Sequence, residues 1–287
     1  MLVVGATNGY GLASRIVSAF GSEAATIGIG FEKAGTATRT GTAGWYNDQA
    51  FHKEARIAGL SAWSINGDAF SVQTKSEVTH LVKEKLGQID FLVYSIAAPR
   101  RIDPETGDIY SSVIKPIGQS FTARTVDFLT GEIETITAGA ATNDEIQQTV
   151  KVMGGEDWFL WVDELYRNGL LATGFLTVAF SYIGSSYTRP LYRDGSIGAA
   201  KKDLEKKAER INKRLEPITG KAFISVNKAL ITRASAVIPA VPLYIALLYR
   251  VMKAKGLHEG CIEQMVRLYY KHLFSGHPLQ LDKKGRI

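Results

Sequence analysis

The sequence predicts an α/β fold of the Rossmann type, in which helices cover both faces of a doubly wound parallel sheet. Two observations lead to this prediction. Apolar runs of strand length alternate with amphipathic stretches of helix length, which is the pattern of parallel βαβ units. The first apolar run, Leu2 to Gly5, continues directly into a glycine-rich segment. Because 287 residues with 45% hydrophobic content can bury one such core, we expect residues 1–287 to form a single domain.

Six strands are expected, each an apolar run of strand length. They are Leu2 to Gly5, Thr26 to Phe31, Ala62 to Ile65, Phe91 to Ser95, Leu176 to Ile183 and Phe223 to Leu230. Seven helices are expected between and after these strands, where the sequence is amphipathic over helix lengths. They are Gly11 to Phe20, Asn47 to Ala58, Ser71 to Lys85, Asp144 to Asn168, Gly198 to Leu215, Pro242 to Lys255 and Glu259 to Phe274.

One stretch, from Pro99 to about Thr149, does not follow this alternation of strands and helices. It consists of polar segments rich in threonine and glycine, and it is longer than most connections inside compact domains. We therefore expect residues 99–149 to be an insertion beside the substrate site.

Composition limits the partners and the compartment. The net charge of +6 would suit nucleic acid, an anionic cofactor or an acidic carrier protein, but the basic residues are mostly dispersed, which disfavours nucleic acid. The longest apolar run, Ala234 to Leu248, contains two prolines, so no membrane span is expected. Cys261 is the only cysteine, and the five histidines lack metal-site spacing. We therefore expect no metal and a reducing, cytoplasmic location.

The segment Gly5 to Gly11 has the spacing GxxxGxG between a strand and a helix. Glycines permit a tight turn, and they let backbone amides and the helix N-terminus approach a pyrophosphate with no Cβ in the way. A glycine pattern alone is a weak signal, and its position between strand and helix strengthens it. The segment therefore predicts a dinucleotide site.

Candidate cofactor contacts follow the next three strands. Glu32 lies about twenty residues beyond the last glycine, where a carboxylate would bind the ribose hydroxyls and repel a 2′-phosphate. This favours NADH over NADPH, although Lys33 softens the preference. Asp68, after the third strand, would lie near the adenine, and an ordinary Asn-Gly turn is the alternative. The segment Tyr94 to Ala98 ends the fourth strand and contains small residues. These would let the backbone pass close to a dinucleotide, and tight packing of the strand on a helix is the alternative.

Tyr192 and Lys201 form a Tyr-x8-Lys arrangement beyond the fifth strand, with a glycine-containing turn leading into the helix of Lys201. A nearby ammonium favours the phenolate and lowers the tyrosine pKa from its ordinary value of about 10. Tyr182 ends the fifth strand. A tyrosine seen alone is more often a packing residue, but the position after this strand favours chemistry at Tyr182, Tyr192 and Lys201.

Segments along almost the whole chain resemble the FabV-type enoyl-acyl-carrier-protein reductases, also called trans-2-enoyl-CoA reductases. They are Gly5 to Gly11, Gly41 to Asn47, Ser64 to Phe70, Ala97 to Arg101, Val152 to Trp158, Gly195 to Gly198 and His258 to Gln264. The Tyr-x8-Lys spacing separates this family from most short-chain dehydrogenases and from the commoner enoyl reductases. Members are usually longer at both ends, so we expect the chain to be a fragment without the family's N-terminal and C-terminal segments.

The resemblance implies roles for individual residues. It implies that the cofactor is bound by Gly5, Ala6, Thr7, Asn8, Gly9, Tyr10, Phe31, Glu32, Asp68, Ala69, Ile96, Ala97, Leu230, Ile231 and Thr232. Lys201 would also contact the cofactor, Tyr182 would bind substrate, and Tyr192 would donate the proton. The apolar stretch from Pro239 to Tyr249 resembles the acyl-chain wall, and a buried packing helix is an equal alternative.

The implied activity is the NADH-dependent reduction of the 2,3-double bond of trans-2-enoyl thioesters in fatty acid biosynthesis. The substrate would be carried by acyl carrier protein or by CoA, and the enzyme would be a monomer. Two alternatives stay open. A 3-ketoacyl or other carbonyl reductase could use the same tyrosine and lysine pair, and a non-catalytic dinucleotide-sensing module would bind NADH without turnover.

Overall fold

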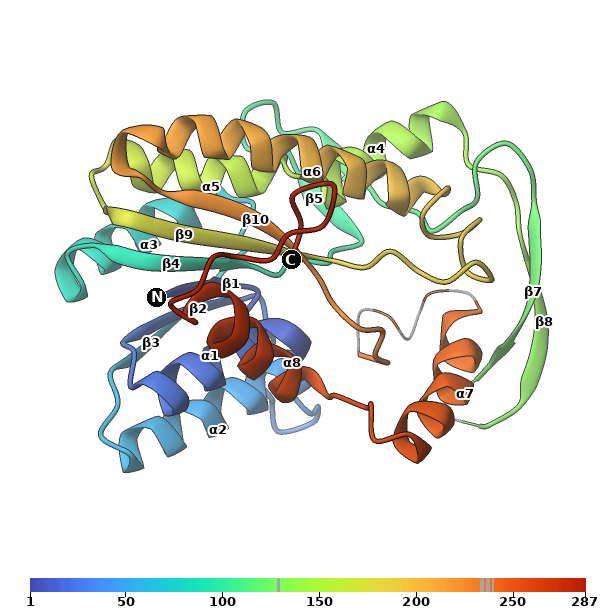
Figure 1. The fold of residues 1–287 in the computed structure, drawn as a ribbon, viewed down its shortest axis with the longest axis horizontal. Helices are drawn as coiled ribbons and strands as arrows, with labels where there is room; N and C mark the ends of the chain where they lie inside the picture. Colours follow the sequence, from blue (N-terminus) through green and yellow to red (C-terminus); the bar gives the residue numbers. More distant parts are fainter. Residues whose placement is uncertain (128–129, 233–234, 236–237, 239) are drawn as a thin grey trace.

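The structure is a computed structural model that describes residues 1–127, 130–232, 235, 238 and 240–287. Its centre is a parallel six-stranded sheet with the order β10-β9-β4-β1-β2-β3 (Figure 1). The strands are β1 (Leu2–Val4), β2 (Thr26–Gly30), β3 (Ala62–Asn66), β4 (Ile89–Tyr94), β9 (Leu171–Ser181) and β10 (Lys221–Val226). The strand order reverses at β1 and β4, and ligands of such sheets bind outside the carboxyl ends at that point. The predicted Rossmann-type sheet is confirmed.

Helices cover both faces of the sheet (Figure 1). One face carries α1 (Gly9–Ser22), α2 (Ala43–Ile57) and α8 (Cys261–Arg267), and the other carries α3 (Val72–Lys85), α5 (Glu156–Arg167) and α6 (Ser196–Leu215). Alternate residues of a strand point to opposite faces. In β1, Leu2 and Val4 therefore enter the core under α3, α5 and α6, whereas Val3 enters the core under α1 and α8.

The strands lie where they were predicted, with shifts at their ends. β9 begins at Leu171 rather than Leu176, and β10 ends at Val226 rather than Leu230. The backbone beyond β10 is bonded elsewhere, because Lys228 donates its N–H to the Gln264 side chain. The chain therefore leaves the sheet earlier than its apolar sequence indicates.

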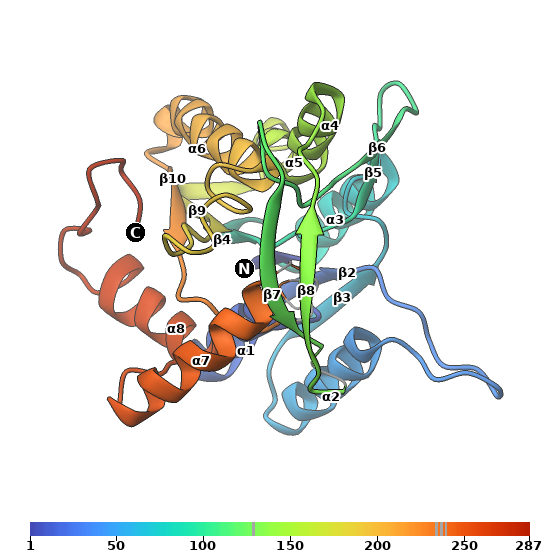
Figure 2. The same cartoon turned by 90° about the vertical axis from the view of Figure 1, so that its right-hand side faces the viewer.

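Residues 99–149 contain two antiparallel hairpins outside the central sheet. They pair β5 (Arg100–Ile102) with β6 (Ile109–Ser111), and β7 (Phe121–Val126) with β8 (Ile133–Ala138). Figure 2 shows the β7–β8 hairpin beside α7 (Val241–Ala254), and β7 contacts that helix. Ala123 of β7 packs with Leu191 and Ala240. These short strands were not predicted from the sequence.

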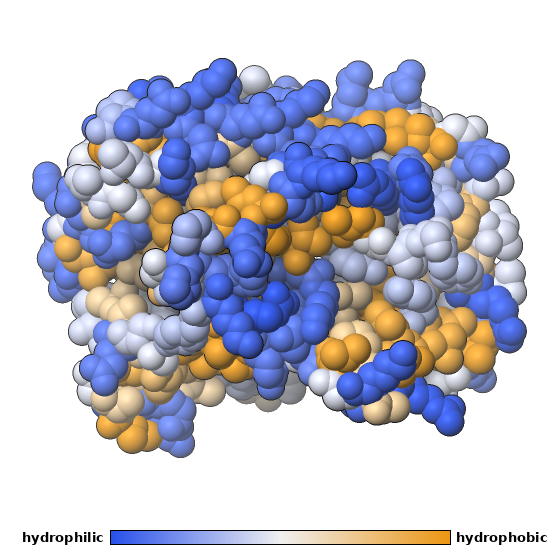
Figure 3. Space-filling view, in the orientation of Figure 1, coloured by the Kyte–Doolittle hydropathy of each residue, from blue (hydrophilic) through white to orange (hydrophobic). Residues whose placement is uncertain are grey.

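The chain beyond β10 forms the predicted helices, and the last of them ends as a π-helix. Pro239, the expected start of the acyl-chain wall, lies outside the described residues. On α7 the side chains of Leu247 and Val251 are 63% and 51% exposed. Figure 3 shows apolar surface at the lower right, where Figure 1 places α7. The last helix is α only to Arg267 and then becomes the π-helix η2 (Leu268–Leu273), whose wider turn accompanies burial of both Leu268 and Tyr269.

No helix in the described part of the chain is both long and apolar enough to span a membrane.

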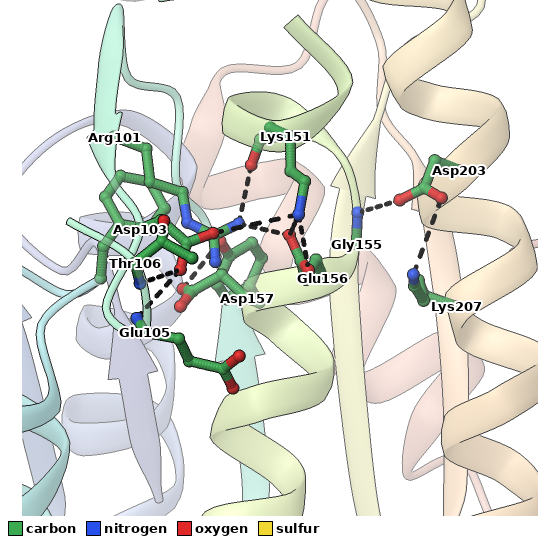
Figure 4. A network of polar contacts seen from close by, with 12 residues as sticks. Arg101, Asp103, Glu105, Thr106, Lys151, Gly155, Glu156, Asp157, Asp203 and Lys207 are labelled. Carbon is green, nitrogen blue, oxygen red and sulfur yellow. Dashed lines mark hydrogen bonds and ion pairs between the residues drawn. The ribbon is translucent and has the colours of Figure 1, made fainter. Parts of the chain in front are cut away.

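The single helix predicted from Asp144 to Asn168 is wrong. The chain forms α4 (Asn143–Met153) and α5, with Gly154 and Gly155 between them. A Cβ on Gly154 would lie 2.4 Å from the Val150 carbonyl oxygen. The Gly155 N–H donates to Asp203 Oδ2 of α6 at 2.9 Å (Figure 4). The two glycines therefore break the helix and let the break pack closely on α6.

Candidate active site

The glycine loop turns tightly between β1 and α1. Gly5 and Gly9 have φ angles of 87° and 51°, in the left-handed region that glycine adopts with little strain. A Cβ on Gly5 would lie 2.3 Å from the Ser95 carbonyl oxygen, and one on Gly11 would lie 1.9 Å from the Gly5 carbonyl oxygen. The Asn8 side chain does not cap α1. The first N–H groups of the helix thus form an end suited to an anion, and this cradle fits a pyrophosphate.

Glu32 lies beyond β2, against the glycine loop. Its Oε1 accepts hydrogen bonds from Thr7 Oγ1 at 2.6 Å and from Asn8 Nδ2 at 3.2 Å. The Asn66 side chain binds both the N–H and the C=O of Glu32, at 2.7 and 2.9 Å. Gly44 leaves room for the carboxylate, because a Cβ there would lie 2.0 Å from Glu32 Oε1. These contacts hold the carboxylate beside the loop, where it fits a ribose.

The other expected residues of the adenosine site lie beyond β2 and β3. Phe31 is 78% exposed. The Asp68 Oδ1 atom accepts the main-chain N–H two residues ahead at 3.0 Å, which orients the carboxylate. The Ala69 carbonyl accepts hydrogen bonds from Lys75 Nζ and Trp161 Nε1. Asp68 and Ala69 therefore belong to a turn whose backbone is fixed by hydrogen bonds from buried side chains.

Two further segments border the glycine loop. Ile96 and Ala97 follow β4, and Ile96 Cδ1 would lie 3.4 Å from a Cβ on Gly5. The segment Leu230 to Thr232 follows β10, and Thr232 Cγ2 would lie 3.7 Å from a Cβ on Gly9. The structure thus brings the ends of β4 and β10 against one loop, as a dinucleotide site requires.

Hydrogen bonds of three side chains hold this part of the site, and two of these side chains, Gln264 and Tyr249, were not selected from the sequence. The Tyr10 hydroxyl donates to the Lys228 carbonyl at 2.6 Å, which ties the start of α1 to the chain beyond β10. The buried Gln264 accepts the Lys228 N–H at 2.8 Å. The Tyr249 hydroxyl accepts the Ile231 N–H at 2.8 Å. The one sequence signal for Gln264 was its place in a segment that resembles the family, and Tyr249 had none beyond its apolar helix.

Tyr182, Tyr192 and Lys201 border the same small cavity. The two tyrosine rings meet edge to face with centroids 4.9 Å apart. Lys201, on α6, donates from Nζ to the Phe180 carbonyl at 3.0 Å. The Phe180 ring contacts the Tyr10 ring with centroids 5.7 Å apart. The three predicted residues are therefore together, and Phe180 connects them to the glycine loop.

Burial controls the titration of these groups. It raises the pKa of Tyr182 to about 12, and it raises the pKa of Tyr192 well above its ordinary value, with a further increase from Tyr182. Burial lowers the pKa of Lys201 to about 8. The predicted lowering of the tyrosine pKa by Lys201 is therefore wrong, because the cost of burying a phenolate dominates. Both tyrosines are protonated at neutral pH and can donate a proton.

The turn that joins Tyr192 to Lys201 is fixed by residues from the 99–149 region. The fully buried Ser196 donates from Oγ to the Val113 carbonyl at 2.5 Å and accepts the Lys115 N–H at 3.2 Å. The Ser196 N–H donates in turn to the Lys115 carbonyl at 3.0 Å. These contacts set where α6 begins and hence where Lys201 lies.

A larger cavity of about 390 Å³ opens beside Tyr182. Its wall includes Gly184, Asn227, Tyr244, Leu248 and Met252, and the last three come from α7. An apolar chain could lie along α7 while its polar end reaches Tyr182.

Two family models match the chain. The NAD(P)H binding domain of trans-2-enoyl-CoA reductase matches residues 1–37, and the trans-2-enoyl-CoA reductase catalytic region matches residues 39–274. The chain belongs to the trans-2-enoyl-CoA reductase family. The resemblance seen in the sequence is thereby confirmed.

Similar proteins carry two kinds of name within this family. The enoyl-acyl-carrier-protein reductase (NADH) of Flavobacterium johnsoniae is 54% identical over 287 residues, which are 100% of this chain and 72% of the relative. The trans-2-enoyl-CoA reductase (NADH) of Ruminiclostridium cellulolyticum is 53% identical with the same two coverages. The solved structure of Clostridium acetobutulicum trans-2-enoyl-CoA reductase in complex with NADH superimposes with a TM-score of 0.98 at 49% identity, covering 100% of this chain and 72% of that one.

Proposed function

We infer that the chain is an NADH-dependent reductase that saturates the 2,3-double bond of trans-2-enoyl thioesters. The observation that carries this inference is the cluster of Tyr182, Tyr192 and Lys201 at one cavity, connected through Phe180 to the glycine loop. Relatives above 50% identity bear the names of NADH-dependent enoyl reductases.

The residues around the loop fit each part of the cofactor. The glycine loop would hold the pyrophosphate, and Glu32 would hold the ribose of the adenosine half. Asp68 and Ala69 would hold the adenine. Ile96 and Ala97, with the segment Leu230 to Thr232, would hold the nicotinamide end. Bound NADH supplies the hydride, and the chain supplies binding, orientation and the proton.

The proton and the thioester are handled by the two tyrosines. Tyr182 would donate a hydrogen bond to the thioester oxygen, which stabilises the negative charge when the β-carbon gains a hydride. Tyr192 would stabilise and protonate the resulting enolate, so one hydride and one proton reduce the double bond. Lys201 would bind the ribose hydroxyls from the same cavity edge.

We also propose which carriers deliver the acyl group, what residues 99–149 do, and the oligomeric state and location of the enzyme. Relatives of equal similarity carry acyl-carrier-protein and CoA names, and both carriers present the thioester on a phosphopantetheine arm. Residues 99–149 are proposed as an insertion beside the substrate site, supported by the contact of Ala123 with Leu191, the residue before Tyr192. The enzyme is proposed to be a cytoplasmic monomer, which sedimentation and cell fractionation would test.

The activity is tested by following NADH oxidation with crotonyl-CoA and with crotonyl-acyl carrier protein. Oxidation with either crotonyl thioester is expected, with NADPH a poorer donor, and the ratio of the two rates identifies the preferred carrier. Turnover with acetoacetyl-CoA alone would instead identify a carbonyl reductase. NADH binding without turnover would identify a dinucleotide-sensing module.

A further inference from the structure

A buried lysine lies beneath the turn that carries Asp68. Lys75 is 7% exposed, and its Nζ donates to the carbonyls of Ala69 and Phe70 at 2.8 and 3.1 Å and to Asp157 Oδ1 at 2.7 Å. These three bonds use all three N–H groups of the ammonium. Two of them fix main-chain carbonyls of the turn.

Neighbouring buried groups complete this network. The indole N–H of Trp161 donates to the Ala69 carbonyl at 3.1 Å, and the Lys75 ammonium lies 5.0 Å from the centre of a Trp161 ring. The Tyr94 hydroxyl donates to the second oxygen of Asp157 at 3.1 Å. Asp157 lies at the start of α5, which Arg101 contacts through Glu156 (Figure 4). Groups from α3, β4 and α5 therefore meet under one turn.

Stability alone is a weak explanation for this arrangement. A buried ion pair loses its hydration, and replacing it with apolar residues is often neutral or stabilising. Here Lys75 binds the backbone that orients Asp68. The Phe70 N–H donates to Asp68 Oδ1, and the Phe70 carbonyl accepts a hydrogen bond from Lys75. Moving that backbone would turn the Asp68 carboxylate.

We propose that Lys75 and Trp161 are positioning residues that set the affinity of the cofactor site for the adenine half of NADH. They hold the carbonyls of Ala69 and Phe70, and through that turn they aim the Asp68 carboxylate at the amino group of the adenine. This inference rests on the proposed cofactor site and adds residues that do not touch the cofactor themselves.

A matched pair of tryptophans on α5 separates positioning from packing. Trp158 and Trp161 are both fully buried, and each donates one indole hydrogen bond. Trp158 donates to Thr177 Oγ1 at 2.9 Å, away from the turn. Trp161→Phe and Trp158→Phe therefore remove the same group from the same helix, and only the first loosens the turn.

The readouts are the KM for NADH, kcat, and the inhibition constants of AMP and of reduced nicotinamide mononucleotide, all with crotonyl-CoA as acceptor. In Trp161→Phe the KM for NADH and the inhibition constant of AMP should rise about three- to tenfold, the effect of one hydrogen bond. The kcat and the inhibition constant of the mononucleotide should stay unchanged. Trp158→Phe should leave both ligand constants unchanged.

A second variant tests the lysine without leaving a buried charge unpaired. Lys75→Met with Asp157→Asn removes both charges together and keeps an acceptor for Tyr94. Its AMP constant should rise at least as much as that of Trp161→Phe, with the mononucleotide constant unchanged. Equal effects of the two tryptophan variants, or equal changes in the two half-cofactor constants, would overturn the proposal. Failure of the unaltered protein to oxidise NADH with crotonyl-CoA would instead reject the proposed function.

Discussion

The rings of Tyr182 and Tyr192 meet edge to face, with centroids 4.9 Å apart and planes inclined at 74°. Tyr182 follows β9, whereas Tyr192 precedes the turn into α6. Burial raises the pKa of both hydroxyls, and each therefore stays protonated through the neutral range. Two neutral donors at one cavity can bind an oxygen and deliver a proton, and substitution can separate these two tasks.

Tyr192→Phe should lower kcat by a factor on the order of 10² or more. The general acid is lost in this variant, while the ring that packs on Tyr182 remains. Tyr182→Phe should mainly raise the KM for crotonyl-CoA, because one hydrogen bond to the thioester is lost. Steady-state kinetics at saturating NADH measure both effects. Unchanged turnover in Tyr192→Phe would reject its role as proton donor.

The pH profile should report Lys201. Burial lowers the pKa of this lysine to about 8, so the ammonium is present below that pH and lost above it. If the charged form binds the ribose, kcat/KM for NADH should fall as the pH rises through about 8, since this ratio reports the free enzyme. Lys201→Arg, which keeps its charge, should abolish that inflection. An inflection that persists in Lys201→Arg would assign it to another group.

Glu32→Ala should remove the preference for NADH over NADPH. A carboxylate in this position binds ribose hydroxyls and repels a 2′-phosphate. The ratio of kcat/KM values for NADH and NADPH should fall roughly 10- to 100-fold, the effect of hydrogen bonds to a charged group. Lys33→Ala, at the adjacent exposed position, is the matched control and should keep the NADH preference. An unaltered ratio in Glu32→Ala would contradict the ribose assignment.

Gly11→Ala should weaken NADH binding at least about tenfold, because the new Cβ would lie 1.9 Å from the Gly5 carbonyl oxygen and the loop must open. The control is Gly139→Ala, since a Cβ on Gly139 meets no atom within 4 Å. Fluorescence titration of each variant with NADH measures the effect. Equal affinities in the two variants would show that the cradle tolerates a side chain.

Ser196→Ala should destabilise the fold by about 1–3 kcal/mol and lower kcat. The Val113 carbonyl and the Lys115 N–H would lose their Ser196 Oγ partner, and α6 would begin less rigidly. Urea unfolding measures the free-energy change. Ser22→Ala removes an exposed hydroxyl instead and should stay within about 0.5 kcal/mol. Full activity in a destabilised Ser196→Ala would show that this contact serves folding alone.

The sheet could be predicted from the sequence because its strands are short apolar runs next to glycine or polar residues. The break between α4 and α5 could not, since Gly154 and Gly155 lie inside an otherwise helical pattern. The glycines allow the break, and a contact with Asp203 of α6, a residue far away in the sequence, holds it in place. Periodicity within one segment carries no information about that contact.

The candidate site shows the same limit. The glycine loop and Glu32 are local signals, and the structure places them together. Tyr249 and Gln264 each bind the backbone of a distant segment, and Lys75 binds the turn just before it while pairing with Asp157, 82 residues away. No local spacing marks such roles. The direction of the Tyr192 pKa shift was also mispredicted, because burial of a side chain is a property of the folded chain.

The hydrogen bond from Tyr10 to Lys228 joins residues 218 positions apart and has a consequence for the modularity of the family. The matched models divide the chain near residue 38, between a nucleotide-binding part and a catalytic part. The Tyr10 hydroxyl nevertheless binds residues of the second part, the Lys228 carbonyl and, at 3.3 Å, Gln264 Oε1. Chimaeras that exchange residues 1–37 between relatives should therefore stay active only when Tyr10 and Gln264 come from a compatible pair.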